Sequence, residues 1–355
     1  MPSDASDRLT ELLSLCHDDP DLFNGAILGR KPYWRRQREI AESVVKYRVT
    51  SAYTGNAVGK DYLVGGLIPW WLYTRHRSLV IVTGPGHTVL GSVTWKELRR
   101  AVEGDESDPL ASVPLGATVS QGVTASPLRC IVRGDWGALG YSTNSIERAS
   151  GQHERKILVI VEESSGVPDE IRDAIESFKF SRLLAIGNPL RARGWFVEHI
   201  RRAEEDRRNG VPPGLAFNAI RVSSRESPDA HLEESPRGLA DATWIAANER
   251  VYGKGSLWCN SHIDAIVPAE DAAQLIPEEW LDYAANCERP PLRPFDPVSK
   301  TRRIACDLGE GVGRDSTAIL VRDDLGVLEW VAGNNLDLPA AAEHIRRLKE
   351  KWRVP

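Results

Sequence analysis

Hydrophobic residues recur with helical and strand-like periods in turn along the chain. In WRRQREIAESVVKY, which begins at Trp34, the apolar residues Ile40, Val44 and Tyr47 lie at helical spacing. The β-branched run RVTSAY follows at once from Arg48 and is typical of a strand. A helix that leads directly into a strand is therefore the first unit of the fold.

The same alternation continues beyond a glycine-containing turn, TGNAVGKD. An amphipathic segment runs to Arg75, the apolar run LVIVTGP begins at Leu79, and a helical stretch extends from 87 to 102. Buried strands are expected again at KILVIVEE, which ends at Glu163, and at RLLAIGN, which ends at Asn188. This rhythm predicts an α/β fold built on a parallel sheet.

Composition shifts divide the chain further. Residues 105–144 are rich in Gly, Ser and Pro, and they are interpreted as an insertion or antiparallel excursion with one strand at LRCIVRG. The proline-dense ERPPLRPFDP marks a semi-rigid linker at 288–301. We therefore expect an N-terminal helical arm at 1–31 and a large domain at 32–287. A smaller α/β segment at 302–355 has three strand-like runs and a helix from Leu338.

Length and composition exclude several classes of protein. A chain of 355 residues with 41% hydrophobic content can bury a large core, and its net charge of -5 argues against a uniformly basic DNA-coating protein. Five widely spaced cysteines without a CxxC pair indicate neither a disulfide framework nor a zinc ribbon. The N-terminus lacks a secretory pattern, and the longest apolar stretch, 63–73, is too short to span a bilayer. A soluble intracellular protein without a membrane segment is expected.

The turn between the first strand and the next helix is a candidate phosphate loop. Backbone amides of a glycine turn and a following helix N-terminus can hold phosphates, and Lys60 would reach the β- and γ-phosphates. The pattern departs from GxxxxGK[ST], because Thr54 replaces its first glycine and Asp61 its final hydroxyl residue. Taken alone, an ordinary glycine turn is an alternative. The candidate nucleotide-binding residues are Gln37, Thr54, Gly55, Asn56, Ala57, Val58, Gly59, Lys60 and Asp61.

Two later strands also end in polar side chains. KILVIVEE ends in Glu162, suited to Mg²⁺, and Glu163, suited to activating the attacking water. A solvated acidic strand end is the alternative for this pair considered alone. RLLAIGN ends in Asn188. Since ligands bind at the carboxyl ends of parallel strands, we expect Lys60, both glutamates and Asn188 to meet around a magnesium-bound triphosphate.

These residues form part of an ordered series that resembles the phage terminase large subunit family. The series runs from about Pro32 to the C-terminus, and it combines an aromatic/Gln stretch, a deviant phosphate loop, an acidic strand and a polar strand end. Its members are Tyr33, Trp34 and Gln37; TGNAVGKD; VTGP with Trp95; Gly151, Gln152 and His153; LVIVEESSGVPDEI; AIGNP with Gly194; VYGKG; and IACDLGEGVGRDSTAIL.

The resemblance implies a P-loop NTPase of the RecA-like/ASCE class that uses ATP and Mg²⁺. Gln37 would belong to the adenine-side motif, Lys60 to Walker A, Glu162 and Glu163 to Walker B, and Asn188 to the motif that senses γ-phosphate. Asp61 and Glu162 would be the metal ligands. Arg148 is the candidate arginine finger, against a solvated surface arginine.

The resemblance also implies a role in moving DNA. The expected partners are double-stranded DNA, a portal protein, a small terminase subunit and further copies of this chain in a ring. The expected location is the host cytoplasm rather than the mature virion. Two alternatives stay open: another nucleic-acid-stimulated P-loop ATPase, helicase-like in kind, or a catalytically silent remnant.

The segment 302–355 resembles the start of the RNase H-like nuclease domain of the same family. Asp307 ends its first strand as a possible ligand of Mg²⁺ or Mn²⁺, and a turn-forming Asp is the alternative. Two-metal cleavage needs several converging carboxylates. We therefore expect this domain to be incomplete, from a truncated or interrupted reading frame, and without nuclease activity.

Overall fold

The computed structural model describes residues 4–104, 122–142, 156–177, 179–269, 301–309, 317–323, 326–333 and 337–355. The chain divides into two compact units, Met1–Glu278 and Glu279–Pro355, and each is described by itself. Nearly all of the expected linker at 288–301 lies outside the described residues. Within the described ranges, no helix combines the length and apolarity needed to cross a bilayer.

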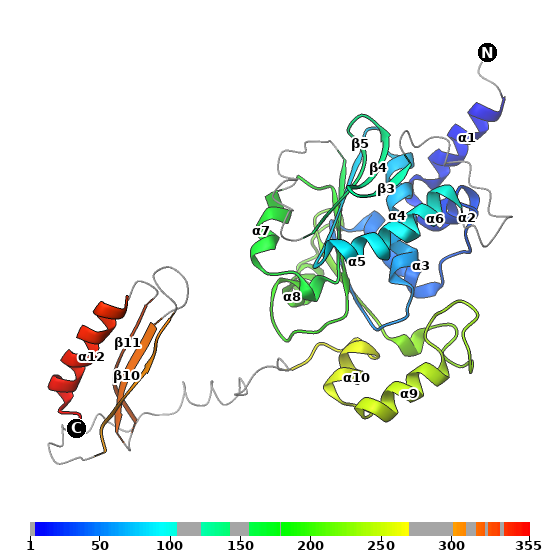
Figure 1. The fold of residues 1–355 in the computed structure, drawn as a ribbon. Coiled ribbons are helices and arrows are strands. Elements are labelled where there is room, and N and C mark those ends of the chain that lie inside the picture. The colour runs from blue at the N-terminus through cyan, green and yellow to red at the C-terminus, as the bar shows by residue number, and fades with distance from the viewer. Residues whose placement is uncertain are drawn as a thin grey trace. The chain divides into compact units, whose positions relative to one another are not determined.

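An eight-stranded sheet forms the centre of the first unit (Figure 1). Its strand order is β3-β4-β5-β2-β6-β7-β1-β8, and all neighbours from β5 to β8 pair in parallel. β3 and β4 add antiparallel pairs at one edge, as expected for an antiparallel excursion. The strands are β1 (Val49–Thr54), β2 (Leu79–Gly84), β3 (Val123–Ala125), β4 (Leu128–Arg133), β5 (Trp136–Ser142), β6 (Ile157–Glu162), β7 (Arg182–Gly187) and β8 (Phe217–Val222).

Helices cover both faces of this sheet (Figure 1). Alternate strand residues point to opposite faces, so Val80 packs with one helical layer and Ile81 with the other. One layer contains α3, α4 and α6, and the other contains α7 and α8. The helices are α1 (Asp4–Leu15), α2 (Pro20–Ala26), α3 (Arg35–Lys46), α4 (Lys60–Thr74), α5 (His87–Ser92), α6 (Thr94–Glu103), α7 (Glu170–Ser177), α8 (Trp195–Arg208), α9 (Ala242–Tyr252) and α10 (Leu257–His262).

The strand order places the polar strand ends side by side. β7 lies between β1 and β6, with Tyr53 opposite Gly187 and Ile186 opposite Glu162. In a parallel sheet these positions share one edge, the edge at which ligands bind. The prediction of a largely parallel sheet with helices on both faces is confirmed.

Two expectations about the helices were wrong. The segment leading to Arg75 is not amphipathic, because α4 is enclosed on all sides and every residue from Leu63 to Leu72 is buried. Its neighbours approach closely: a Cβ on Gly65 would lie 3.0 Å from the Cβ of Glu97. The stretch from 87 to 102 is two helices, α5 and α6, separated at Val93.

The second unit contains a small antiparallel sheet and one helix. The strands β9 (Arg303–Asp307), β10 (Thr317–Asp323) and β11 (Gly326–Gly333) have the order β11-β10-β9, and α12 (Leu338–Trp352) follows. Ile319 and Val321 of β10 pack with Ala341 and Leu348 of α12. Asp307 ends β9 and is exposed.

Candidate nucleotide-binding site

The turn from Thr54 to Asp61 connects β1 to α4 and has the backbone geometry of a phosphate-binding loop. Ala57 and Gly59 take left-handed φ values of 54° and 77°. Gly55 leaves no room for a side chain, since a Cβ there would lie 2.2 Å from Ser224 Oγ. Such alternations of backbone conformation turn successive N–H groups toward one concave side, where they can bind an anion.

Hydrogen bonds from three other segments, namely the start of α3 and the stretches at Ser224 and Ala240, hold the carbonyl groups of this loop. Among described residues, no acceptor contacts the N–H groups of Ala57, Val58 or Gly59. Because a peptide's C=O and N–H point in opposite directions, binding the carbonyls from outside leaves these amides available for phosphate oxygens. The four bonds are Ser224 Oγ to Asn56 O (2.7 Å), Ala240 N to Ala57 O (2.7 Å), Trp34 Nε1 to Val58 O (3.1 Å) and Gln37 Nε2 to Gly59 O (2.8 Å).

Lys60 brings together the three polar strand ends. Its Nζ lies 3.6 Å from Glu163 Oε1 and donates to Asn188 Oδ1 over 3.4 Å. Asn188 is buried, and its Nδ2 donates to Thr54 O over 2.9 Å, which fixes the amide across β7 and β1. The expected meeting of the lysine, a strand-end glutamate and the asparagine is therefore observed.

Glu162 lies beneath this cluster. Only 8% of it is exposed, and burial raises the pKa of its carboxyl group to about 8, while a hydrogen bond from the Thr94 hydroxyl opposes that rise. Thr94 is fully buried at the start of α6. The sequence analysis did not identify Thr94 as a site residue. The feature that could have suggested it is its position at the start of a helix that follows a strand and a short helix.

Asp61 adds a third carboxylate beside one lysine. Burial raises the pKa of Asp61, the Lys60 charge lowers it, and Glu163 and Glu97 raise it again. The carboxyl groups of Asp61, Glu162 and Glu163 thus lie near the single amine of Lys60, and burial favours the neutral forms of Asp61 and Glu162 by raising their pKa values. No group of three or more His, Cys, Asp or Glu in the described ranges is arranged to hold a metal alone. Mg²⁺ in nucleotide sites uses one or two carboxylates plus phosphate oxygens, so the donor set fits a metal that enters with its substrate.

Glu163 follows β6 in a left-handed conformation, with φ 46°. Its neighbour across the sheet is Gly187, where a Cβ would lie 3.0 Å from Glu163 Cα and 2.9 Å from Ser164 N. The turn needs a glycine at this point. The side chain of Glu163 is 42% exposed, so a water molecule can reach it, in contrast to buried Glu162.

Other expected site residues have different positions. Gln37 contacts the phosphate loop backbone, where the sequence analysis expected an adenine-side role. Arg148 and the Gly151, Gln152 and His153 motif lie outside the described residues.

A comparison with curated proteins connects this site to a known family. No protein-family model matches the chain. The chain is 25% identical over 252 residues to a protein named "Probable terminase, large subunit" of Enterobacteria phage P7, a match that covers 69% of this chain and 47% of that protein. The chain is thus similar in sequence to a terminase large subunit. It spans about half the length of this curated relative.

Solved structures of large terminases are also similar to this chain. The large terminase ATPase domain of Thermus phage P74-26 is 18% identical, with a TM-score of 0.46, over 69% of this chain and 97% of that one. The large terminase of another thermophilic bacteriophage, in complex with ADP, is 14% identical, with a TM-score of 0.45, over 94% of this chain and 74% of that one.

Proposed function

We propose that the first unit binds MgATP at the Lys60 loop and hydrolyses it to ADP and phosphate. The observation that supports this most strongly is the position of Lys60 Nζ, 3.6 Å from Glu163 Oε1 and 3.4 Å from Asn188 Oδ1 at the ligand-binding edge of a parallel sheet. An ion pair with a purely structural role would not need the left-handed residues of the adjoining loop. It would also not need a loop whose carbonyl groups are hydrogen-bonded to other segments while its N–H groups stay available.

Each side chain has a distinct role in this proposal. The loop amides and Lys60 bind the phosphates, and Glu163 accepts a proton from the attacking water. Asn188, held by Thr54 O, contacts the γ-phosphate and responds to its loss. Asp61 and Glu162 would hold Mg²⁺, which neutralises charge on the phosphates when bound. Thr94 orients Glu162.

We further propose that hydrolysis moves double-stranded DNA during phage packaging. The support is the sequence match to a terminase large subunit together with the nucleotide site. In this role the chain would act in the host cytoplasm as a ring of identical copies, with a portal protein and a small terminase subunit. Arg148 is the proposed finger toward a neighbouring copy's nucleotide.

Duplex DNA is expected to stimulate ATP hydrolysis more than single-stranded DNA of equal nucleotide content. A packaging motor contacts the duplex backbone, so stimulation should fall as salt rises. The measurement is steady-state phosphate release with each DNA at several salt concentrations, with Lys60→Ala as the inactive control. Equal or stronger stimulation by single strands, or strand unwinding, would favour a helicase-like ATPase instead.

For the second unit we propose the start of an RNase H-like domain, with Asp307 as a metal ligand. We expect this chain to show no metal-dependent plasmid cleavage in Mg²⁺ or Mn²⁺, because two-metal cleavage needs several converging carboxylates and the described residues hold no cluster of three or more His, Cys, Asp or Glu. The assay is conversion of supercoiled plasmid to nicked or linear forms. Cutting that disappears in Asp307→Ala would contradict the expectation.

A further inference from the structure

The side chain of Gln37 uses both ends of its amide within the protein. Nε2 donates to Gly59 O over 2.8 Å and to Val58 O over 3.4 Å, while Oε1 accepts from the backbone N–H of Trp34 over 3.3 Å. This network also fixes which end of the amide is nitrogen, since carbonyls cannot donate. Gln37 is 5% exposed. Both of its N–H groups are therefore occupied, and neither faces solvent as a group that reads a nucleotide base would.

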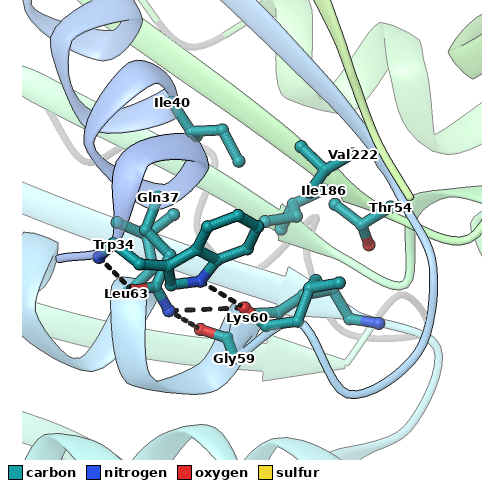
Figure 2. A pocket seen from close by; sticks show the side chains of 10 residues that line it. Trp34, Gln37, Ile40, Thr54, Gly59, Lys60, Leu63, Ile186 and Val222 are labelled. Carbon is teal, nitrogen blue, oxygen red and sulfur yellow. Dashed lines mark hydrogen bonds between the residues drawn. The ribbon is translucent and has the colours of Figure 1, made fainter. Parts of the chain in front are cut away.

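Trp34 binds the same part of the loop. Its indole Nε1 donates to Val58 O over 3.1 Å. Figure 2 shows the indole beside the Gln37 amide, which points toward Gly59. The two residues are coupled, because Gln37 Oε1 accepts a hydrogen bond from the backbone N–H of Trp34 at the N-terminus of α3. A single rigid helix start thus presents three donors to two consecutive loop carbonyls.

The surroundings make this contact difficult to replace. The pocket beside it is lined mainly by apolar side chains, including Ile40, Leu63 and Ile186. If both donors left, the carbonyl of Val58 would face this apolar space without a partner, and Gly59 O would keep only its bond from Leu63 N at 3.2 Å. Rotation of the Val58 peptide would then move a loop N–H group that faces the phosphates. Gly59 also lies directly against the Gln37 side chain, since a Cβ at Gly59 would lie 2.6 Å from Gln37 Nε2.

We propose that Trp34 and Gln37 are positioning residues that clamp the phosphate loop by its carbonyls, so that they determine affinity for the phosphate chain and not selectivity for the base. This inference rests on the proposed nucleotide site. It assigns to Gln37 a function different from the adenine-side role expected from the sequence.

The test compares ATP, GTP and inorganic tripolyphosphate, each with Mg²⁺, in wild type, Gln37→Ala and Trp34→Phe. We expect Gln37→Ala to weaken binding of all three by a similar factor, about 25-fold for two lost hydrogen bonds to the loop, and Trp34→Phe to weaken it about fivefold for one. The ratio of ATP to GTP affinity should not change. In hydrolysis, KM should rise while kcat stays near the wild-type value, as for loss of uniform binding.

Trp136→Phe is the matched control. It also removes one indole-to-carbonyl bond, Trp136 Nε1 to Leu72 O at 3.0 Å, but its partner Leu72 lies on α4 away from the phosphate loop. We expect it to change no affinity. Thermal unfolding of every variant separates loss of fold from loss of binding. If Gln37→Ala does not fold, the affinities of Trp34→Phe, which keeps an aromatic ring in place, decide the test.

Two results would overturn the clamp. One is a Gln37→Ala variant that loses ATP affinity while retaining tripolyphosphate affinity, which would indicate base recognition. The other is unchanged affinity for all three ligands in both variants. Failure of the proposed function looks different, because wild type and Lys60→Ala would then bind the triphosphates equally or not at all.

Discussion

Glu163→Gln is expected to lower kcat for ATP hydrolysis by about 10²–10⁴-fold, the usual contribution of a positioned general base. The amide keeps the shape of the side chain but cannot accept the proton of the attacking water. Nucleotide affinity should be retained, because the loop amides and Lys60 remain. Single-turnover hydrolysis and equilibrium binding of ATP, measured on the same preparation, check both parts of the prediction.

Glu198→Gln is the control for this substitution. Glu198 lies on α8 with 46% of its side chain exposed, close to the 42% of Glu163, and it pairs with Arg172 over 3.5 Å away from the loop. Its replacement should leave kcat unchanged. If Glu163→Gln hydrolyses ATP as fast as wild type, Glu163 is not the base and the acidic strand end is only a solvated surface.

Lys60→Ala is expected to reduce kcat/KM for ATP by at least about 100-fold, as for removal of a preorganised charge at a transferring phosphoryl group. The effect should be large here because Lys60 Nζ lies beside Glu163 and Asn188, and its loss leaves the phosphates next to the carboxyl groups of Asp61 and Glu163 without that positive charge. Binding of ATP should fall together with turnover.

Lys46→Ala provides the comparison for Lys60→Ala. Lys46 ends α3, is 62% exposed and pairs with Glu42 over 3.5 Å, so its loss removes a lysine without touching the site. Calorimetric titration of both variants with MgATP is the measurement. Wild-type affinity in Lys60→Ala would show that the nucleotide does not bind at this loop.

The sheet and the meeting of its strand ends could be predicted because both are local in sequence. Runs such as LVIVTG and ILVIVE are mostly apolar, as expected for strands buried on both faces, and a polar residue directly after such a run must lie at the carboxyl edge. Glu163 and Asn188 follow from that rule, and Lys60 follows from the glycine turn after the first strand. The antiparallel pairing of β3, β4 and β5 could be predicted only as a possibility, because the Gly-rich sequence at 105–144 shows little hydrophobic periodicity.

The contacts that shape the site could not be predicted, because they join residues far apart in the sequence. Thr94 donates a hydrogen bond to Glu162, Ser224 to Asn56, and Trp34 to Val58. No sequence spacing identifies such pairs in advance. Burial of α4 was missed for a related reason, since a helix enclosed by neighbours on every side has no polar face to reveal its period.

The central claim is that Lys60, Glu163 and Asn188 surround the γ-phosphate of a bound nucleotide. An experimental structure of this chain with Mg²⁺ and a slowly hydrolysed ATP analogue tests it most directly. We predict γ-phosphate oxygens within hydrogen-bonding distance of Lys60 Nζ and the Asn188 amide, with loop amides on the β-phosphate and the Glu163 carboxylate facing the water side. A nucleotide bound elsewhere, or a γ-phosphate remote from Lys60, would contradict the account.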